Sequence, residues 1–188
     1  MRPFSFSILL FITIVSCSNP KDDIYTTFGK AYDNRENVYE FQYNPEFSGE
    51  VYDEIPDLVC ELSHLKSFEM EGANLTSIPS CMCDMKSISW LVLNDNKLSY
   101  LPSNIGNMEG LGYLALVGND LEEIPESIGE LTKLKRLYLR GNKLSSLPSS
   151  ISNLKKLESL DLAYNNFSSI EKRRIEKLLP NCEINWEP

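Results

Sequence analysis

Hydrophobic residues return along the central part of the chain with a fixed period of 23 residues. The pattern LxxLxLxxNxLxxLPxxIxxL recurs without an inserted or missing residue, and its first position falls on Leu65, Ile88, Leu111, Leu134 and Leu157. Each full copy has seven apolar positions, numbers 1, 4, 6, 11, 14, 18 and 21, and all 28 of them are apolar in the four full copies. A chain that is 42% hydrophobic does not produce this regularity by chance, so the repeat determines the fold.

Two kinds of spacing occur within each copy. Positions 4 and 6 differ by two, which is typical of a strand, whereas positions 11, 14, 18 and 21 differ by three and four, which is typical of a helix. One copy is therefore predicted to form a short strand, a turn and a helix-like return. A single copy cannot bury seven apolar side chains alone, so the copies must stack with their strands in parallel, and we expect at least three to be needed.

Two further positions of the repeat have structural roles. A carboxamide both donates and accepts hydrogen bonds, so asparagines stacked at position 9 can satisfy the backbone of a bend in adjacent copies. These asparagines are Asn96, Asn119, Asn142 and Asn165. Proline at position 15 has a fixed φ that can open the return segment, and it occurs at Pro79, Pro102, Pro125 and Pro148.

This pattern resembles the leucine-rich repeat family, in particular its 23-residue class of bacterial and plant intracellular members, over residues 38 to 186. The resemblance implies an α/β solenoid. It implies an arc with a parallel sheet on the concave face, helical or irregular returns on the convex face, and usually a protein ligand on the concave face. It implies no particular ligand.

The repeat spacing continues on both sides and predicts two caps. Residues 38–62 repeat the apolar pattern as a first coil that is four residues longer, with the insertion at 44–49. Before it, Thr27 to Asn37 is predicted to form a short capping helix, with Phe28 and Ala31 or Tyr32 packed on the first coil.

At the carboxyl end, Ile170, Ile175, Leu178 and Leu179 have helical spacing, so the last return is predicted to be a true helix. Leu179, Cys182 and Ile184 then restate the strand spacing as an edge strand, which Trp186 can cover. The sheet should therefore have about seven strands.

The amino terminus has the features of a secretory signal. Arg2 precedes an apolar run, Ile8 to Val15, that is too short to span a bilayer. The run ends in Ile-Val-Ser before Cys17, which resembles the lipobox of bacterial lipoproteins and implies that Cys17 is lipidated. The alternative is a plain signal peptide with an incidental cysteine. Residues 21–23, Lys-Asp-Asp, resemble a signal for the outer face of the outer membrane.

Taken together, these features divide the chain into five parts. We expect a lipoprotein signal peptide at residues 1–16, a lipidated tether at 17–26, an N-terminal cap and first coil at 27–64, four full repeats at 65–156, and a last coil and C-terminal cap at 157–188. The resulting prediction is a lipid-anchored protein of the bacterial cell envelope, at the outer membrane and exposed at the cell surface. The sequence leaves the oligomeric state undetermined.

Cysteines elsewhere allow a disulfide between neighbouring coils. Cys60 and Cys83 occupy repeat position 19 in adjacent coils, whose strands lie about 4.8 Å apart. That spacing is within reach of a disulfide, and Cys81 is a competing partner for Cys60. Cys182 fills a core position and is expected to be buried.

Composition excludes several classes of function. The formal net charge of −9, without a basic stripe, argues against DNA or RNA as a partner. The only histidine, His64, lies beside no strand serine that could act as a nucleophile, and with Cys81 and Cys83 it offers too few ligands for zinc. We therefore predict no enzymatic activity, no cofactor and no metal site. An envelope hydrolase remains the alternative.

The strand positions that face away from the core form the candidate binding surface. Positions 4 and 6 point inward, so positions 3, 5 and 7 face solvent. In the middle coils these positions carry an apolar and aromatic patch beside two arginines: Trp90, Val92, Tyr113, Ala115, Val117, Arg136, Tyr138 and Arg140.

Aromatic residues beside arginine are typical of binding hot spots. Our hypothesis is a protein or peptide ligand centred on Trp90, Tyr113 and Tyr138, with an acidic group near the two arginines. Two alternatives stay open. The aromatic side chains can be idle surface residues, or the ligand can be a glycan whose sugar faces stack on them.

Overall fold

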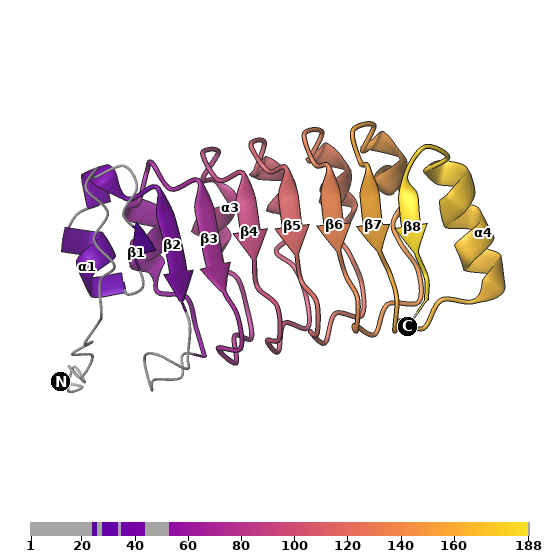
Figure 1. The fold of residues 1–188 in the computed structure, drawn as a ribbon, viewed down its shortest axis with the longest axis horizontal. Helices are drawn as coiled ribbons and strands as arrows, with labels where there is room; N and C mark the ends of the chain where they lie inside the picture. The colour runs from indigo at the N-terminus through magenta and orange to yellow at the C-terminus, as the bar shows by residue number, and fades with distance from the viewer. Residues whose placement is uncertain (1–23, 26–27, 34, 44–52, 188) are drawn as a thin grey trace.

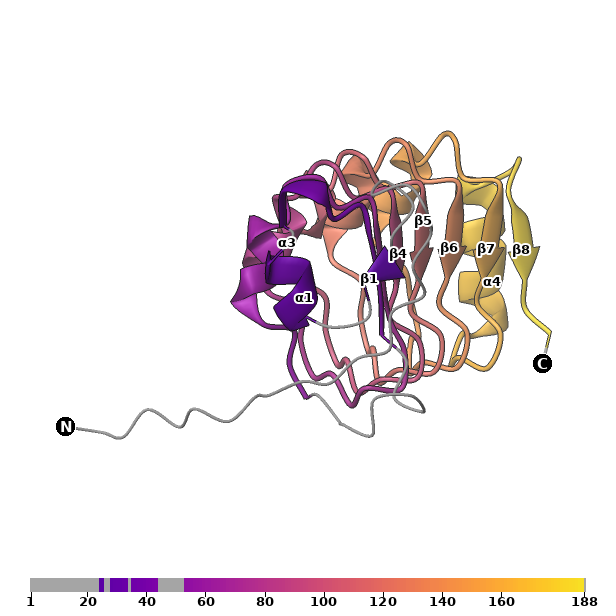
Figure 2. The ribbon, with the colours of Figure 1, turned by 60° about the vertical axis from the view of Figure 1, so that its left-hand side comes forward.

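The computed structural model describes residues 24–25, 28–33, 35–43 and 53–187. Its strands form one parallel sheet in chain order from β1 to β8, each paired with the next (Figure 1). The return segments lie on the opposite side of the stacked coils from the sheet (Figure 2). The predicted α/β solenoid is therefore confirmed.

The elements alternate regularly between strand and return. The strands are β1 (Ile24–Tyr25), β2 (Glu40–Tyr43), β3 (Ser67–Met70), β4 (Trp90–Val92), β5 (Tyr113–Ala115), β6 (Arg136–Tyr138), β7 (Ser159–Asp161) and β8 (Glu183–Asn185). The returns are α1 (Phe28–Asp33), the 3₁₀ helices η1 (Arg35–Asn37), η2 (Asp57–Glu61), η3 (Ile105–Asn107), η4 (Glu126–Glu130) and η5 (Ser149–Asn153), and the helices α3 (Ser80–Cys83) and α4 (Ser169–Leu178). The seven predicted strands are β2 to β8, and β1 is an additional short strand.

The 23-residue period sets the register of the sheet. Because the period is constant, equal repeat positions pair with each other, as in Leu91 with Leu114 and Leu114 with Leu137. All 28 apolar positions of the four full copies are buried, and the most exposed of them, Met85, reaches only 8%. The aliphatic side chains thus form one continuous core behind the sheet.

The asparagines of position 9 link neighbouring coils, as predicted. Asn119 accepts a hydrogen bond at Oδ1 from the Leu98 amide at 3.0 Å and donates from Nδ2 to the Leu93 carbonyl at 2.9 Å. The other three asparagines make the same two bonds to the preceding coil. Asn96, Asn119 and Asn142 are at most 7% exposed, and Asn165 in the last coil is half-buried. This ladder satisfies backbone groups that the bend leaves unpaired.

The N-terminal cap follows the prediction where it is described. Phe28 and Ala31 of α1 are buried, and the Phe28 ring stacks on Phe41 with ring centroids 4.5 Å apart. Strand β1 pairs with β2 and extends the sheet beyond the first coil. The predicted signal peptide, Cys17, Thr27 and the insertion at 44–49 lie outside the described residues.

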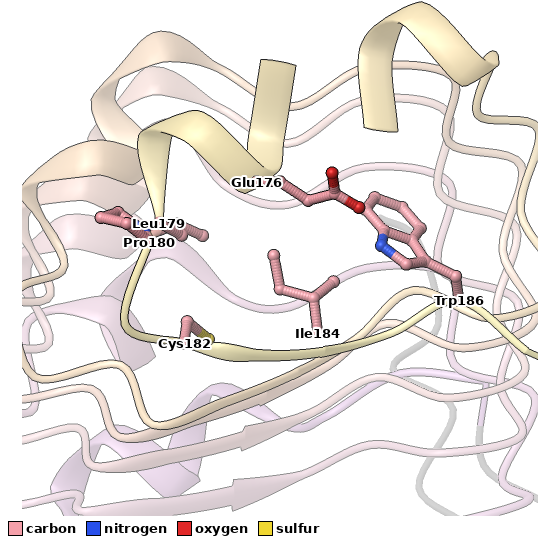
Figure 3. Close-up of a pocket in the computed structure, with 6 residues that line it drawn as sticks. All are labelled: Glu176, Leu179, Pro180, Cys182, Ile184 and Trp186. Carbon is pink, nitrogen blue, oxygen red and sulfur yellow. The ribbon is translucent and has the colours of Figure 1, made fainter. Parts of the chain in front are cut away.

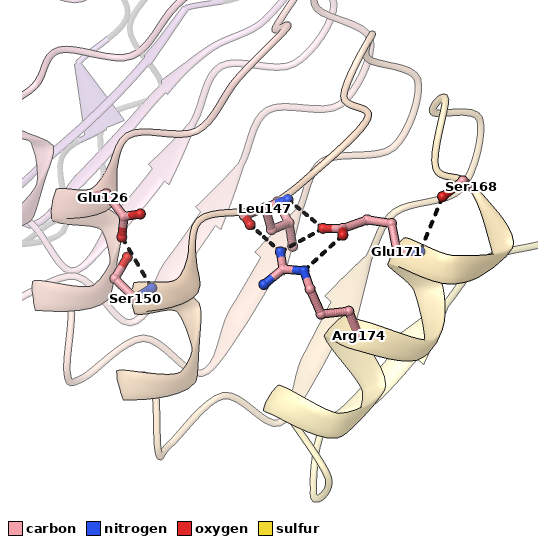
Figure 4. A network of polar contacts seen from close by, with 6 residues as sticks. All are labelled: Glu126, Leu147, Ser150, Ser168, Glu171 and Arg174. Atoms are coloured by element: carbon pink, nitrogen blue, oxygen red, sulfur yellow. Dashed lines mark hydrogen bonds and ion pairs between the residues drawn. The ribbon is translucent and has the colours of Figure 1, made fainter.

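The C-terminal cap is built on a true helix, as predicted. The Ser168 hydroxyl accepts a hydrogen bond from the Glu171 amide at 3.2 Å and caps α4. Glu171 accepts from the Leu147 amide at 3.2 Å, while its partner Arg174, 2.6 Å away, donates to the Leu147 carbonyl (Figure 4). The helix thereby satisfies both backbone groups of one residue in the preceding coil. The pKa of Glu171 is lowered because Arg174 donates to its carboxylate.

Of the four apolar residues whose spacing predicts the last helix, Ile170 does not pack on the core. Its side chain is 73% exposed, whereas Ile175 and Leu179 are buried. At about 100° per residue, five residues separate Ile170 from Ile175 by roughly 140° around the helix. Because the two side chains point in different directions, only Ile175 faces the core.

The disulfide pairs Cys60 with Cys81 rather than with Cys83. The two Cα atoms lie 6.0 Å apart, and both side chains are half-buried, whereas Cys83 is a buried free thiol. The return of the first coil is a 3₁₀ helix and that of the second is α-helical. Because these helices have different numbers of residues per turn, equal repeat positions do not face each other. Cys81, the alternative partner that the sequence allowed for Cys60, is therefore the observed one.

Candidate functional site

The outward positions of the strands line up in rows across the sheet. One row runs from Ser67 through Trp90, Tyr113 and Arg136 to Ser159, because the register pairs these residues strand by strand. The next row runs through Glu69, Val92, Ala115, Tyr138 and Asp161. The predicted ligand residues of these two rows are thus neighbours on one surface, which we call the sheet face.

Three aromatic rings form a continuous array on the sheet face. The rings of Trp90 and Tyr113 are parallel, with an interplanar angle of 8° and centroids 3.5 Å apart. Tyr138 lies beside Tyr113 at 5.4 Å and an angle of 55°. Offset stacking and tilted contacts each contribute about 0.5–1.5 kcal/mol beyond the area they bury. The array is therefore held in place before any ligand arrives.

Val92 does not fit its predicted role as a ligand contact. Its side chain is 5% exposed, and Ala115 beside it is 2% exposed. Both are short side chains that stand in a row between the longer Glu69 and Tyr138. They form the floor of the patch, while the half-buried rings and Val117 present the accessible surface.

Carboxylates border the array on its β3 side. Burial raises the pKa of Glu69, the nearby Trp90 indole N–H lowers it, and the charges of Glu71 and Glu40 raise it, so that the net shift is upward. Trp90 Nε1 is itself buried, and although it lies near Glu69, it has no hydrogen bond of normal geometry to any described residue. An amide of Gln42 donates to Glu69 at 3.0 Å. This side of the patch is acidic and partly desolvated.

Two arginines border the array on its other side. Arg136 is exposed, and the Arg140 guanidinium carbon lies 4.5 Å from the centroid of the Tyr164 ring. Within the described part of the chain neither arginine has an ion-pair partner. Both guanidinium groups are therefore free to accept an anionic group.

Tyr164 is a site residue that the sequence analysis missed. It has a left-handed backbone, with φ of 53°, at repeat position 8. The same position in the other coils holds Gly72, Asp95, Gly118 and Gly141, all with positive φ. A left-handed backbone at a residue with a side chain costs of order 1–3 kcal/mol. An aromatic residue where the repeat favours glycine was the signal available in the sequence.

The remaining chemical groups of the described residues lie apart from one another. His64 is exposed, with its ring 5.9 Å from that of Tyr39. Among the described residues, no three His, Cys, Asp or Glu side chains lie close enough together to hold a metal ion. No helix in that part of the chain is both long and apolar enough to cross a bilayer. The sheet face is therefore the candidate site.

A small hollow lies at the C-terminal cap, between α4 and β8 (Figure 3). It is lined by Glu176, Leu179, Pro180, Cys182, Ile184 and Trp186. Burial raises the pKa of the Cys182 thiol to about 11, so the thiol stays protonated and unreactive at neutral pH. At about 250 Å³ the hollow is smaller than the roughly 300–1,000 Å³ of most small-molecule sites.

Comparison with known proteins supports the solenoid. A profile described as leucine rich repeat matches residues 109–167 and 132–178. A leucine-rich repeat protein from Leptospira interrogans is 30% identical, with a TM-score of 0.58, over 80% of this chain and 42% of that one. The chain matches no curated protein sequence at a significant level.

Two further solved structures share the fold. Internalin C2 from Listeria monocytogenes is 19% identical, with a TM-score of 0.64, over 81% of this chain and 61% of that one. A plant ice-binding protein is 24% identical, with a TM-score of 0.56, over 70% and 42% of the two chains. The chain therefore spans less than two thirds of the length of each of these three structures.

Proposed function

We propose that this chain, a leucine-rich repeat protein, binds a protein or peptide ligand through its sheet face and is held at a bacterial cell envelope by a lipid on Cys17. Leucine-rich repeats commonly serve as binding scaffolds without enzymatic activity. The proposed ligand contacts are Trp90, Tyr113 and Tyr138 at the centre, with Arg136 and Arg140 beside them.

The observation that carries the binding proposal is the preformed aromatic array beside two arginines that have no ion-pair partner among the described residues. The Tyr113 ring contacts both Trp90 and Tyr138, so the three side chains lose little further rotamer freedom when a ligand covers them. None of the three is needed for the repeat, whose core lies on the opposite side of the strands. A rigid aromatic centre with a charged border is typical of interface hot spots.

The paired substitution Trp90→Ala and Tyr138→Ala should remove ligand binding. Each hot-spot aromatic residue contributes about 2 kcal/mol or more, so affinity should fall by a factor of about 30 for each residue removed, and by about 800 if the two losses add. We would measure affinity capture by the purified chain from envelope extracts, with captured proteins identified by mass spectrometry. Capture unchanged by the paired substitution rejects the sheet face. If soluble glycans compete with capture and peptides do not, the ligand is a carbohydrate instead.

Trp186→Ala is the matched control. It also removes an aromatic contact, with Phe167 at 5.5 Å, but at the C-terminal cap. Because Trp90 packs on Tyr113, we expect both variants to lose some thermal stability. Capture should fall only in the variant of the sheet face, and an equal loss in the control would show that capture follows stability alone.

The envelope proposal is supported by the amino-terminal sequence. An apolar run from Ile8 to Val15 precedes Cys17, and a polar stretch follows it. Two of the similar structures also come from bacteria. The surface location proposed for the anchor is supported by the Lys-Asp-Asp sequence at 21–23.

Cys17→Ser should abolish lipid attachment. When the full chain is expressed in a Gram-negative host with an alkyne-labelled fatty acid, the wild-type chain should carry the label and globomycin should cause its precursor to accumulate. The variant should remain unlabelled and unprocessed by the lipoprotein pathway. Labelling that persists in the variant, or a wild-type chain without label, contradicts the lipid anchor.

A further inference from the structure

The two borders of the aromatic array carry opposite charges that the described residues do not neutralise. On one side, the hydrogen bonds that Glu69 and Glu71 accept within the described part of the chain come from the amides of Gln42 and Asn94, at 3.0 and 3.2 Å. Neither carboxylate has an ion-pair partner in the described ranges, although other carboxylates of the chain, such as Glu109 with its lysine, do. The acidic border is thus open to a cation.

The structure gives the acidic border a second feature that suits a cation. Trp90 stacks on Tyr113 with one face of its ring, and its neighbour on the other side in the same row is the small Ser67. No described cation lies against the indole. A cationic group standing over Ser67 would contact the open side of Trp90 and the Glu69 carboxylate together, which combines a cation–π contact with an ion pair. Such a group would also offset the burial that raises the pKa of Glu69.

At the basic border, formed by Arg136 and Arg140, one arginine is positioned by a tyrosine whose backbone conformation is unfavourable. Arg140 lies over the ring of Tyr164, whose φ of 53° is the one that three other coils assign to glycine. The contact orients the Arg140 guanidinium without pairing its charge. Arg136 lies four residues before Arg140 in the same coil, at the start of β6, so two cations without an ion-pair partner among the described residues lie near each other on the sheet face.

The distance between the borders sets the spacing that a ligand must have. Strand β3 and strand β6 are three strand spacings apart, which is about 14 Å at 4.8 Å per strand. An extended peptide advances about 3.3 Å per residue, so its opposite charges should be about four or five residues apart.

We propose that the ligand is an extended segment with its charges in two separate blocks, a cationic block over Glu40, Glu69 and Glu71 and an anionic block over Arg136 and Arg140, joined by an apolar or aromatic residue on the Trp90–Tyr113 stack. This inference rests on the proposed function, because it specifies the ligand of the same face.

Two synthetic peptides of about ten residues and identical composition test the charge order. One carries its lysines at one end and its glutamates at the other, with tyrosine and leucine between them, and the second alternates the same lysines and glutamates. Fluorescence anisotropy with the full chain at low salt should show the segregated peptide binding at least about tenfold more tightly. Equal affinities, or no binding of either peptide, overturn the inference.

Charge reversal provides the matched variants. Glu40→Lys with Glu71→Lys, or Arg136→Glu with Arg140→Glu, should each weaken the segregated peptide by about tenfold or more. The variant with all four reversals should recover most of that affinity, because the peptide can bind in the opposite direction. A fourfold reversal no better than either pair overturns the proposal, and melting temperatures identify any variant that has unfolded. If a variant has unfolded, glutamine replaces the same pairs of residues instead, and each glutamine pair should lose less affinity for the segregated peptide than the charge reversal would.

Tyr164→Gly separates the positioning role from folding. Glycine relieves the left-handed backbone, so the melting temperature should be unchanged or higher, while the affinity for the segregated peptide should fall. Unchanged affinity removes Tyr164 from the inference. If the paired Trp90 and Tyr138 substitutions abolish capture from extracts while both peptides bind equally, the proposed function stands and the charge order fails.

Discussion

Replacing Asn119 by alanine should lower the free energy of unfolding by about 4 kcal/mol. The side chain accepts from the Leu98 amide and donates to the Leu93 carbonyl and to the Leu116 carbonyl, at 3.0, 2.9 and 3.1 Å. All of these groups are buried, so alanine leaves the Leu98 amide and the Leu93 carbonyl without partners and without water, at a cost of roughly 1–3 kcal/mol each, whereas the Leu116 carbonyl keeps its hydrogen bond from Asn142. The effect is large because one carboxamide serves two coils.

Urea unfolding followed by circular dichroism measures this loss, and Asn166→Ala is its control. Asn166 lies in the same bend of a later coil, but its side chain is exposed and makes one long bond, 3.4 Å, to the Lys143 carbonyl. We expect the control to change the free energy of unfolding by less than about 0.5 kcal/mol. A loss below about 1 kcal/mol for Asn119→Ala would contradict the ladder as a stabilising element.

Removing the disulfide with Cys60→Ser and Cys81→Ser should cost about 3 kcal/mol. The bond joins residues 21 apart and ties the first coil to the first full repeat. Without it the unfolded chain gains conformational freedom, and the N-terminal coils should unfold at a lower temperature than the rest. The loss should appear in thermal scans of the variant, and the wild-type chain should show the same loss after reduction.

Thiol alkylation after denaturation checks the pairing directly. Among the cysteines of the described residues, only Cys83 and Cys182 should react without reductant, and all four should react after reduction. Cys182→Ser is the control for stability, because it removes a free, half-buried thiol and should have little effect. Labelling of all four cysteines without reductant would show that the bond is absent.

The sequence predicted the fold because every coil has the same apolar positions. A constant spacing of 23 residues is enough to place equal positions side by side, and position 9 could be assigned to the bend from its asparagines alone. Strand β1 could not be predicted, since a pair such as Ile24–Tyr25 joins the sheet through its backbone and has no repeat spacing. The partner of Cys60 could not be predicted, because it depends on which returns are α-helical and which are 3₁₀. The spacing of apolar residues does not distinguish these two kinds of short helix.

For the candidate site, the sequence predicted which residues share a face but not how they contact each other. Alternation along a strand places Trp90, Tyr113 and Tyr138 on one surface. Whether the rings stack, and whether Val92 is overtopped by its neighbours, depends on side-chain size in adjacent strands and on rotamers that only packing decides. Tyr164 could not be found from the alternation along the strands, because it lies in the bend that follows the outward strand positions.

The alternation of inward and outward positions has a practical consequence for engineering. The 28 buried positions and the asparagines can be kept as an invariant frame, while the outward positions of β3 to β7 are randomised in a display library. Most members should fold, because a changed side chain on that surface displaces none of the interior. Selection for binding to chosen targets could then give the scaffold new ligands. Replacing the stacked pair Trp90 and Tyr113 should lower the stability of the library members, because their ring contact is lost.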